Sequence, residues 1–210
     1  VDITCRTSGL RPSAAVIVAT VRALKYHGGV GLDALETEDL AALDTGMLNL
    51  ERHVANIRDV FGLPSVVCIN RFDGDTPAEL DLAHRRVREM GVEVVTSSHW
   101  SDGGTGALDL AEAVVDLCDQ PSALSFAYPD ASPLWEKVTA VAQRVYGAAE
   151  VTADPRTHAR ITELEQAGYG HLPVCIAKTQ YSFSTNPDLK GAPSDHTIPV
   201  REVRLSAGAE

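Results

Sequence analysis

The stretch at residues 65–70, SVVCIN, decides the fold class. It is almost continuously apolar and rich in β-branched residues, which is typical of a strand buried on both faces of a parallel sheet. Residues 14–21, AAVIVATV, have the same character, and residues 92–96 form a shorter segment of this kind. The sequence therefore predicts three parallel strands, the first two of them buried.

Segments with helical periodicity alternate with these strands. Residues 47–61 place apolar side chains at helical spacing with charges between them, residues 76–90 form a second such pattern that stops at Gly91, and residues 107–118 form a third. Strands and helices that alternate through short connections predict right-handed crossovers. We therefore expect residues 1–118 to form an α/β fold in which a parallel sheet carries helices on both faces.

Residues 119–210 are predicted to form a smaller α/β appendage. Pro, Ser and Ala are frequent in residues 119–133, which should leave the sheet. We expect two further helices and then two strand-like segments, over residues 133–146, 155–167, 172–177 and 197–205.

Charge and hydropathy exclude several classes of protein. The formal net charge is −11 and no cluster of Lys and Arg is present, which argues against broad binding to nucleic acid. The longest apolar run, residues 14–21, is too short to span a membrane, and no signal peptide opens the chain. The four cysteines are far apart without metal-like spacing, which indicates a reducing cytoplasm. The first residue is not Met, which indicates a fragment, a processed product or a chain without its front part.

Ligands of open parallel sheets bind beyond the carboxyl ends of the strands. Three loops qualify, at residues 22–29, 70–75 and 97–106. The second begins with Asn-Arg-Phe-Asp, and Asn followed by a cation and Asp after a buried strand resembles the base-reading element of P-loop nucleotide-binding proteins. Asn70 could pair with a purine edge there. The alternative is that Asn70 caps the strand and Asp75 caps the next helix.

Trp100 lies in the third loop, in a polar, Gly-rich setting that no periodic pattern buries. Exposed aromatic side chains at strand ends provide flat surfaces for ring-shaped ligands. Together with Phe72 on the neighbouring loop, Trp100 could close a slot around a planar heterocycle. The alternative is that both rings plug the top of the core.

Motifs for metal, phosphate and nucleophile chemistry are missing from the sequence. The seven histidines show no HExxH or similar spacing, so no metal site is predicted. The chain contains neither a GxxxxGKS or GxxxxGKT loop, nor GxGxxG, nor a GxSxG elbow. Any residues that bind phosphate are therefore expected outside this chain, and no catalytic residue is assigned.

Several long strings, taken together, resemble successive motifs of formate–tetrahydrofolate ligases, in the same order and at similar spacing. They are CRTSGL at 5–10, VATVRALK at 18–25, NRF at 70–72, HW at 99–100 followed by two glycines at 103–104, LPVCIAKTQYS at 172–182 and VREVRLSAGA at 200–209. The resemblance implies a core similar to P-loop proteins. It also implies the ATP-dependent joining of formate to tetrahydrofolate through formyl phosphate, which gives 10-formyltetrahydrofolate.

The resemblance implies roles for particular residues and ligands. Phe72 and Trp100 would sandwich the folate ring system. A second set of residues would lie beside the nucleotide or pterin, namely Asn70, Arg71, Thr96, Ser97 and Ser98. ATP and tetrahydrofolate would be substrates with formate, and the complete enzyme would use magnesium and form a homo-oligomer.

Three departures from the family pattern limit what this chain is expected to do alone. The phosphate-cradling loop is absent, the Gly-Glu-Gly of the family appears as Gly-Thr-Gly at 104–106, and the family chain continues beyond the last residues seen here. We therefore expect a partial ligase that is inactive without the missing amino-terminal portion. The alternatives are a non-catalytic folate- or nucleotide-binding fragment and, disfavoured by the absent phosphate loop, a GTPase-like switch.

Overall fold

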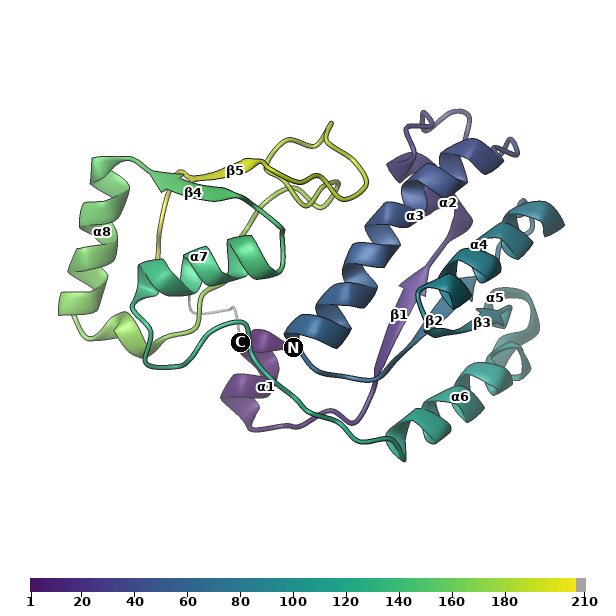
Figure 1. Cartoon of the computed structure of the whole chain (residues 1–210), viewed down its shortest axis with the longest axis horizontal. Coiled ribbons are helices and arrows are strands. Elements are labelled where there is room, and N and C mark those ends of the chain that lie inside the picture. The colour runs from purple at the N-terminus through teal and green to yellow at the C-terminus, as the bar shows by residue number, and fades with distance from the viewer. Residues whose placement is uncertain (207–210) are drawn as a thin grey trace. The chain divides into compact units, whose positions relative to one another are not determined.

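The computed structural model describes residues 1–206, which form two compact units (Figure 1). The larger unit comprises Pro12–Leu124 together with Lys190–Ala192. The smaller unit comprises Val1–Arg11, Ser125–Leu189 and residues 193–206.

The larger unit is built on a parallel sheet, as predicted. Strands β1 (Ala15–Ala19), β2 (Ser65–Asn70) and β3 (Glu93–Ser97) pair in the order β1-β2-β3. Helices α2 (Val21–His27) and α3 (Leu40–Ala55), with a π-helical turn at Asn56–Val60, connect β1 to β2, and α4 (Pro77–Glu89) connects β2 to β3. Helices α5 (His99–Asp102) and α6 (Leu108–Cys118), joined by a 3-10 turn at Gly103–Ala107, follow β3. The α/β fold class is confirmed.

Side-chain caps fix where the larger unit's helices begin. The side chains of Thr20 and Asp39 accept hydrogen bonds from backbone N–H groups in the first turns of α2 and α3. Thr76 and Glu79 form a reciprocal capping box at the start of α4. Gly91 takes a left-handed conformation, φ 74°, just after α4 ends, as the predicted stop requires.

Helices cover both faces of the sheet. Val67 and Ile69 of β2 point into the main core, which α2, α3 and α4 supply with buried side chains. Val66, on the opposite face of β2, packs against Ala113 and Leu117 of α6. Adjacent residues of a strand face opposite ways, so β2 is buried on both faces, as expected.

The prediction that the first strand is buried on both faces is wrong. Along β1 half-buried residues alternate with exposed ones, and Val16 and Val18 are 41% and 63% exposed. Among the described residues β1 pairs only with β2, and α6 packs over β2 and β3. The side chains of a strand are buried on a face only where another layer covers that face, and α6 covers this face of the sheet at β2 and β3.

Replacing one valine in each strand by alanine should show the difference in burial between β1 and β2. Val67→Ala in β2 should lower the free energy of unfolding by about 2 kcal/mol, because it removes fully buried carbon atoms and leaves a cavity. Val18→Ala in β1 should lower it by less than about 0.5 kcal/mol. Chemical denaturation measures both values, and equal losses would show that the outer face of β1 is covered in solution.

The smaller unit combines helices α1 (Asp2–Ser8), α7 (Leu134–Arg144) and α8 (Pro155–Gln166) with a two-stranded parallel sheet, β4 (Glu150–Ala153) and β5 (Thr197–Val200). Leu134, Ile161 and Leu164 form one of its apolar clusters. The predicted helices at 133–146 and 155–167 are confirmed by α7 and α8.

Some of the predicted elements are wrong. Residues 172–177 are not a strand, and the backbone N–H of Val174 donates to the Tyr128 hydroxyl at 3.0 Å. Of the predicted strand-like segment 197–205, only Thr197–Val200 forms a strand, β5, which pairs with β4. Residues 22–27, expected as a loop, belong to α2, because Thr20 caps a helix immediately after β1. Helix α1 was not predicted, since its seven residues are too few to show a periodic pattern.

Candidate functional site

The second and third predicted ligand loops meet at one edge of the sheet. Strands β2 and β3 are neighbours, and Asn70 at the end of β2 is the register partner of Ser97 at the end of β3. The backbone N–H of Arg71 then donates to the Ser97 carbonyl oxygen at 3.0 Å. The loops that carry Phe72 and Trp100 are therefore joined at their base.

Phe72 lies in a tight turn whose backbone is held from both directions. The Phe72 N–H donates to the Asp75 carboxylate at 2.8 Å, and the Asp75 N–H donates to the Phe72 carbonyl at 3.0 Å. Asp75 is buried, and burial raises the pKa of its carboxyl group, with the nearby charge of Glu79 adding to the shift. Asp75 does not cap α4, because Thr76 occupies that position. It fixes the turn that carries Phe72.

Asn70 presents an unused acceptor at this edge. Its Oδ1 atom is buried and has no hydrogen-bond partner among residues 1–206. A buried acceptor without a partner costs about 1–3 kcal/mol, so such an atom calls for an explanation. A ligand N–H group, such as the amino group of a purine, would satisfy it.

Trp100 lies on a loop whose two ends are joined by hydrogen bonds. The Ser98 N–H and the Ser97 hydroxyl both donate to the Gly106 carbonyl, at 3.0 and 3.1 Å. The Ser97 hydroxyl also lies 2.7 Å from Nδ1 of His99, the first residue of α5. Only glycine fits at position 106 without a shift of the backbone, because a Cβ atom there would lie 2.5 Å from the Ser98 carbonyl carbon. The loop between Ser98 and Gly106 is thus pinned at its base.

Trp100 itself is 75% exposed, so it does not plug the top of the core. Phe72 is half-buried in its turn. Both aromatic residues follow paired strand ends at the same edge of the sheet. That the two rings face one another across a slot stays a prediction.

The remaining predicted residues point to both faces of the sheet. The hydroxyl of Thr96 lies 2.7 Å from Nε2 of His84 on α4, and burial lowers the pKa of His84. Ser97 is fully buried on the opposite face, beside Cys68, whose thiol has a pKa raised by burial. Thr96 is therefore separated by the sheet from the Ser97 side chain, while Arg71 is exposed.

Sequence reasoning missed a buried ion pair next to the Phe72 turn. The Lys25 ammonium lies 2.8 Å from the Glu79 carboxylate, and the two side chains are 2% and 0% exposed. The Thr-x-x-Glu spacing of the capping box, Thr76 to Glu79, is a sequence signal that could have drawn attention to Glu79. No sequence pattern points to Lys25 as its partner.

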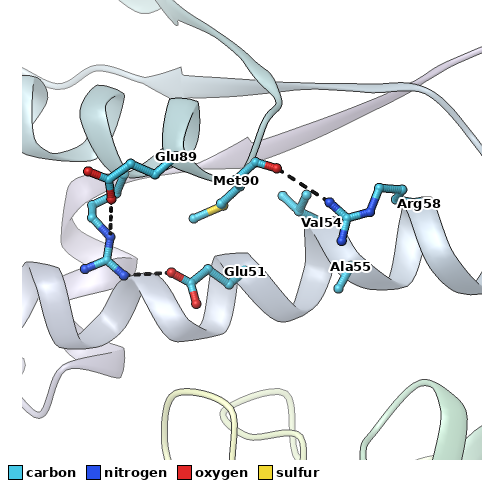
Figure 2. Close-up of a pocket in the computed structure, with 7 residues that line it drawn as sticks. Glu51, Val54, Ala55, Arg58, Glu89 and Met90 are labelled. Carbon is cyan, nitrogen blue, oxygen red and sulfur yellow. Dashed lines mark hydrogen bonds and ion pairs between the residues drawn. The ribbon is translucent and has the colours of Figure 1, made fainter.

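A cavity of about 350 Å³ lies between α3 and α4 (Figure 2). It lies at the end of α4 away from the Phe72 turn. It is lined by Glu51, Val54, Ala55, Arg58, Arg86, Glu89 and Met90. Arg58 reaches the Met90 carbonyl at 3.5 Å, at the opposite end of α4 from the Phe72 turn. Arg86 is already paired with Asp44, Glu51 and Glu89. The cavity is not part of the candidate site.

Neither a metal site nor a membrane span is found in the described part of the chain. Residues 1–206 bring no three His, Cys, Asp or Glu side chains together in a way that could hold a metal ion. None of the helices within these residues has the length and apolarity needed to cross a membrane.

The fold and the site define a class of protein. This is an α/β protein with a parallel sheet, in which the loops at the carboxyl ends of two adjacent strands carry an exposed indole and a buried amide oxygen without a hydrogen-bond partner among residues 1–206. The model of the formate–tetrahydrofolate ligase family matches residues 1–210. The chain therefore belongs to the formate–tetrahydrofolate ligase family.

Individual members of this family are similar over the whole chain. The formate–tetrahydrofolate ligase of Methylibium petroleiphilum is 55% identical over 214 residues, which cover 100% of this chain and 38% of that ligase. The ligase of Granulibacter bethesdensis is 55% identical over 210 residues, 100% of this chain and 36% of that ligase. The ligase of Nocardioides sp. is 54% identical and is covered to 38%. The chain thus spans somewhat more than a third of the length of these relatives.

Proposed function

We propose that this chain is part of an ATP-dependent ligase that joins formate to tetrahydrofolate. Within it, the chain contributes the folate platform, Phe72 and Trp100, together with a set of residues beside the nucleotide or pterin: Asn70, Arg71, Thr96, Ser97 and Ser98. The observation that carries the proposal is Trp100, which is 75% exposed on a loop pinned at the end of β3. Family membership supports the substrates.

In the proposed reaction a formate oxygen attacks the γ-phosphorus of ATP and ADP leaves, which gives formyl phosphate. N10 of tetrahydrofolate then attacks the formyl carbon, the bond from that carbon to the phosphate oxygen breaks, and the N10 proton is lost to the departing phosphate, which gives 10-formyltetrahydrofolate and hydrogen phosphate. The residues of this chain act by orientation in both steps, since stacked rings fix the pterin and therefore the position of N10. The unused acceptor of Asn70 fits an amino group of the purine or the pterin.

We also propose that magnesium accompanies ATP in the complete enzyme. Magnesium that accompanies a nucleotide is usually held by one or two carboxylates together with phosphate oxygens and water, and within residues 1–206 no group of three possible ligands comes together. In this proposal its protein ligands lie elsewhere in the enzyme.

The exposed face and free edge of β1 support a partner for the chain. Val16 and Val18 leave apolar surface in water, and within residues 1–206 only β2 pairs with β1. Unpaired strand edges are sites for the addition of further strands. We infer that the remaining portion of the ligase continues the sheet here. A homo-oligomeric complete enzyme and a cytoplasmic location belong to the same proposal, and four free cysteines fit a reducing compartment.

The chain alone should show no synthesis of 10-formyltetrahydrofolate from ATP, formate and tetrahydrofolate, because its sequence contains no phosphate-cradling loop. The assay should be repeated after addition of the amino-terminal portion of a relative, such as the Methylibium ligase. Restored turnover would support the partial ligase. Turnover by the chain alone would contradict the proposal.

A non-catalytic binding fragment is the second candidate, favoured by the exposed Trp100 in a chain whose sequence contains no phosphate-binding loop. Persistent folate binding with no turnover in the mixed assay would support it.

A further inference from the structure

Glu79 is a fully buried carboxylate that joins three segments of the larger unit. One oxygen lies 2.8 Å from the Lys25 ammonium on α2 and accepts from the Asp39 N–H, before α3, at 3.2 Å. The other oxygen accepts from the Thr76 N–H at 3.1 Å. The Lys25 ammonium also donates to the Thr37 carbonyl at 2.9 Å.

The charge on Glu79 is maintained despite its burial. Burial opposes ionisation, but hydrogen bonds from Lys25 and from the backbone N–H groups of Thr76 and Asp39 outweigh it and lower the pKa of Glu79. The Lys25 ammonium and both Glu79 oxygens are therefore bound to one another or to backbone groups.

A buried ion pair of this kind is weak evidence for stability, since apolar side chains of similar size often serve as well. What apolar side chains could not do is bind the Thr76, Asp39 and Thr37 backbone groups. The pair therefore specifies where the start of α4 lies relative to α2 and to the segment before α3.

The start of α4 carries the Phe72 turn directly. Thr76, which Glu79 holds, follows Asp75, and Asp75 makes the two hydrogen bonds that close the turn around Phe72. The path from Lys25 through Glu79 and Thr76 to Phe72 consists of hydrogen bonds of 2.8–3.2 Å and adjacent residues in the chain.

We propose that Lys25 and Glu79 are positioning residues that set the Phe72 turn for a folate ring system. The proposal rests on the proposed function and deepens it. Neither side chain reaches solvent, so both act through the turn and not by contact with the ligand.

The test is calorimetric titration of tetrahydrofolate into the 210-residue chain and its variants. Glu79→Gln should raise the Kd roughly five- to tenfold, because the ligand must then order a turn that is no longer preorganised. In Glu79→Gln the buried Lys25 ammonium loses its carboxylate partner, and the double variant Lys25→Met/Glu79→Gln removes that unpaired charge. It should therefore fold even if the single variant does not, and its Kd should rise by a similar factor. Arg86→Gln is the matched control, since it breaks ion pairs on the same helix far from the turn and should leave the Kd unchanged.

Amide hydrogen exchange at Phe72 gives a readout that does not depend on the ligand. The Phe72 N–H donates to Asp75, and its protection should fall in Glu79→Gln and in the double variant, but not in Arg86→Gln. If the wild-type chain binds no tetrahydrofolate, the proposed function fails and the exchange result alone decides the positioning role. The proposal would be overturned if the Phe72 N–H exchanged at the wild-type rate in these variants. It would also be overturned if the double variant lost stability but bound tetrahydrofolate with the wild-type Kd.

Discussion

Replacing Trp100 by alanine is expected to weaken tetrahydrofolate binding several-fold or more and to leave the free energy of unfolding nearly unchanged. The indole is 75% exposed, so its removal takes little apolar surface out of the core. An aromatic pair contributes about 0.5–1.5 kcal/mol beyond the area it buries, and the buried area of the ligand adds to this. Calorimetric titration gives the Kd, and chemical denaturation gives the stability.

Trp135 offers a matched control within the same chain. Its ring packs against His158 in the smaller unit, with ring centroids 4.4 Å apart, and next to the cluster around Leu134. Trp135→Ala should therefore reduce stability and leave folate binding unchanged. The platform would be refuted if Trp100→Ala cost about 3–5 kcal/mol of stability, as a core residue does, and had no effect on the ligand.

The second large effect is expected from Gly46→Ala in α3. A Cβ atom at Gly46 would lie 1.8 Å from the Leu24 carbonyl oxygen and 2.7 Å from its carbon, in the backbone of α2. Backbone atoms cannot move aside as a flexible side chain can, so α2 and α3 would have to separate. We expect a loss of about 3 kcal/mol or more in the free energy of unfolding, at or above the upper end of overpacking effects.

Gly104→Ala is the control for this prediction, because a Cβ atom there meets nothing within 4 Å. Its effect should stay within about 0.5 kcal/mol, as for ordinary surface changes. Chemical denaturation followed by circular dichroism compares the two variants. If both lose the same small amount, α2 and α3 do not pack as closely as described.

Much of the larger unit could be predicted because its local signals agree with its tertiary surroundings. Residues 65–70 form β2 at the predicted bounds, and α4 begins after Thr76 and stops before Gly91, as its capping and stop residues indicate. Apolar periodicity, caps and a glycine stop all favour the same structure in these segments.

Elements whose existence depends on distant residues could not be predicted. Strand β4 has four residues and is defined by its pairing with β5, nearly fifty positions later in the chain. The outer face of β1 is exposed because α6 packs over β2 and β3, although the composition of β1 resembles that of β2. Periodicity describes the segment itself and says nothing of its neighbours.

The candidate site shows the same division. The single helix and strand between them were enough to predict that the Phe72 and Trp100 loops share an edge of the sheet. The hydrogen bond from Ser97 to Gly106 and the ion pair of Lys25 with Glu79 depend on contacts between segments. Such contacts appear only when the helices are placed in space.

The most direct test of the central claim is a crystal structure of the chain with tetrahydrofolate bound. We expect the pterin ring system to lie between Phe72 and Trp100 at the carboxyl edge of β2 and β3, with an N–H group of the ligand or of a bound nucleotide near Oδ1 of Asn70. Tetrahydrofolate bound at another place, or in contact with neither ring at a saturating concentration, would contradict the account.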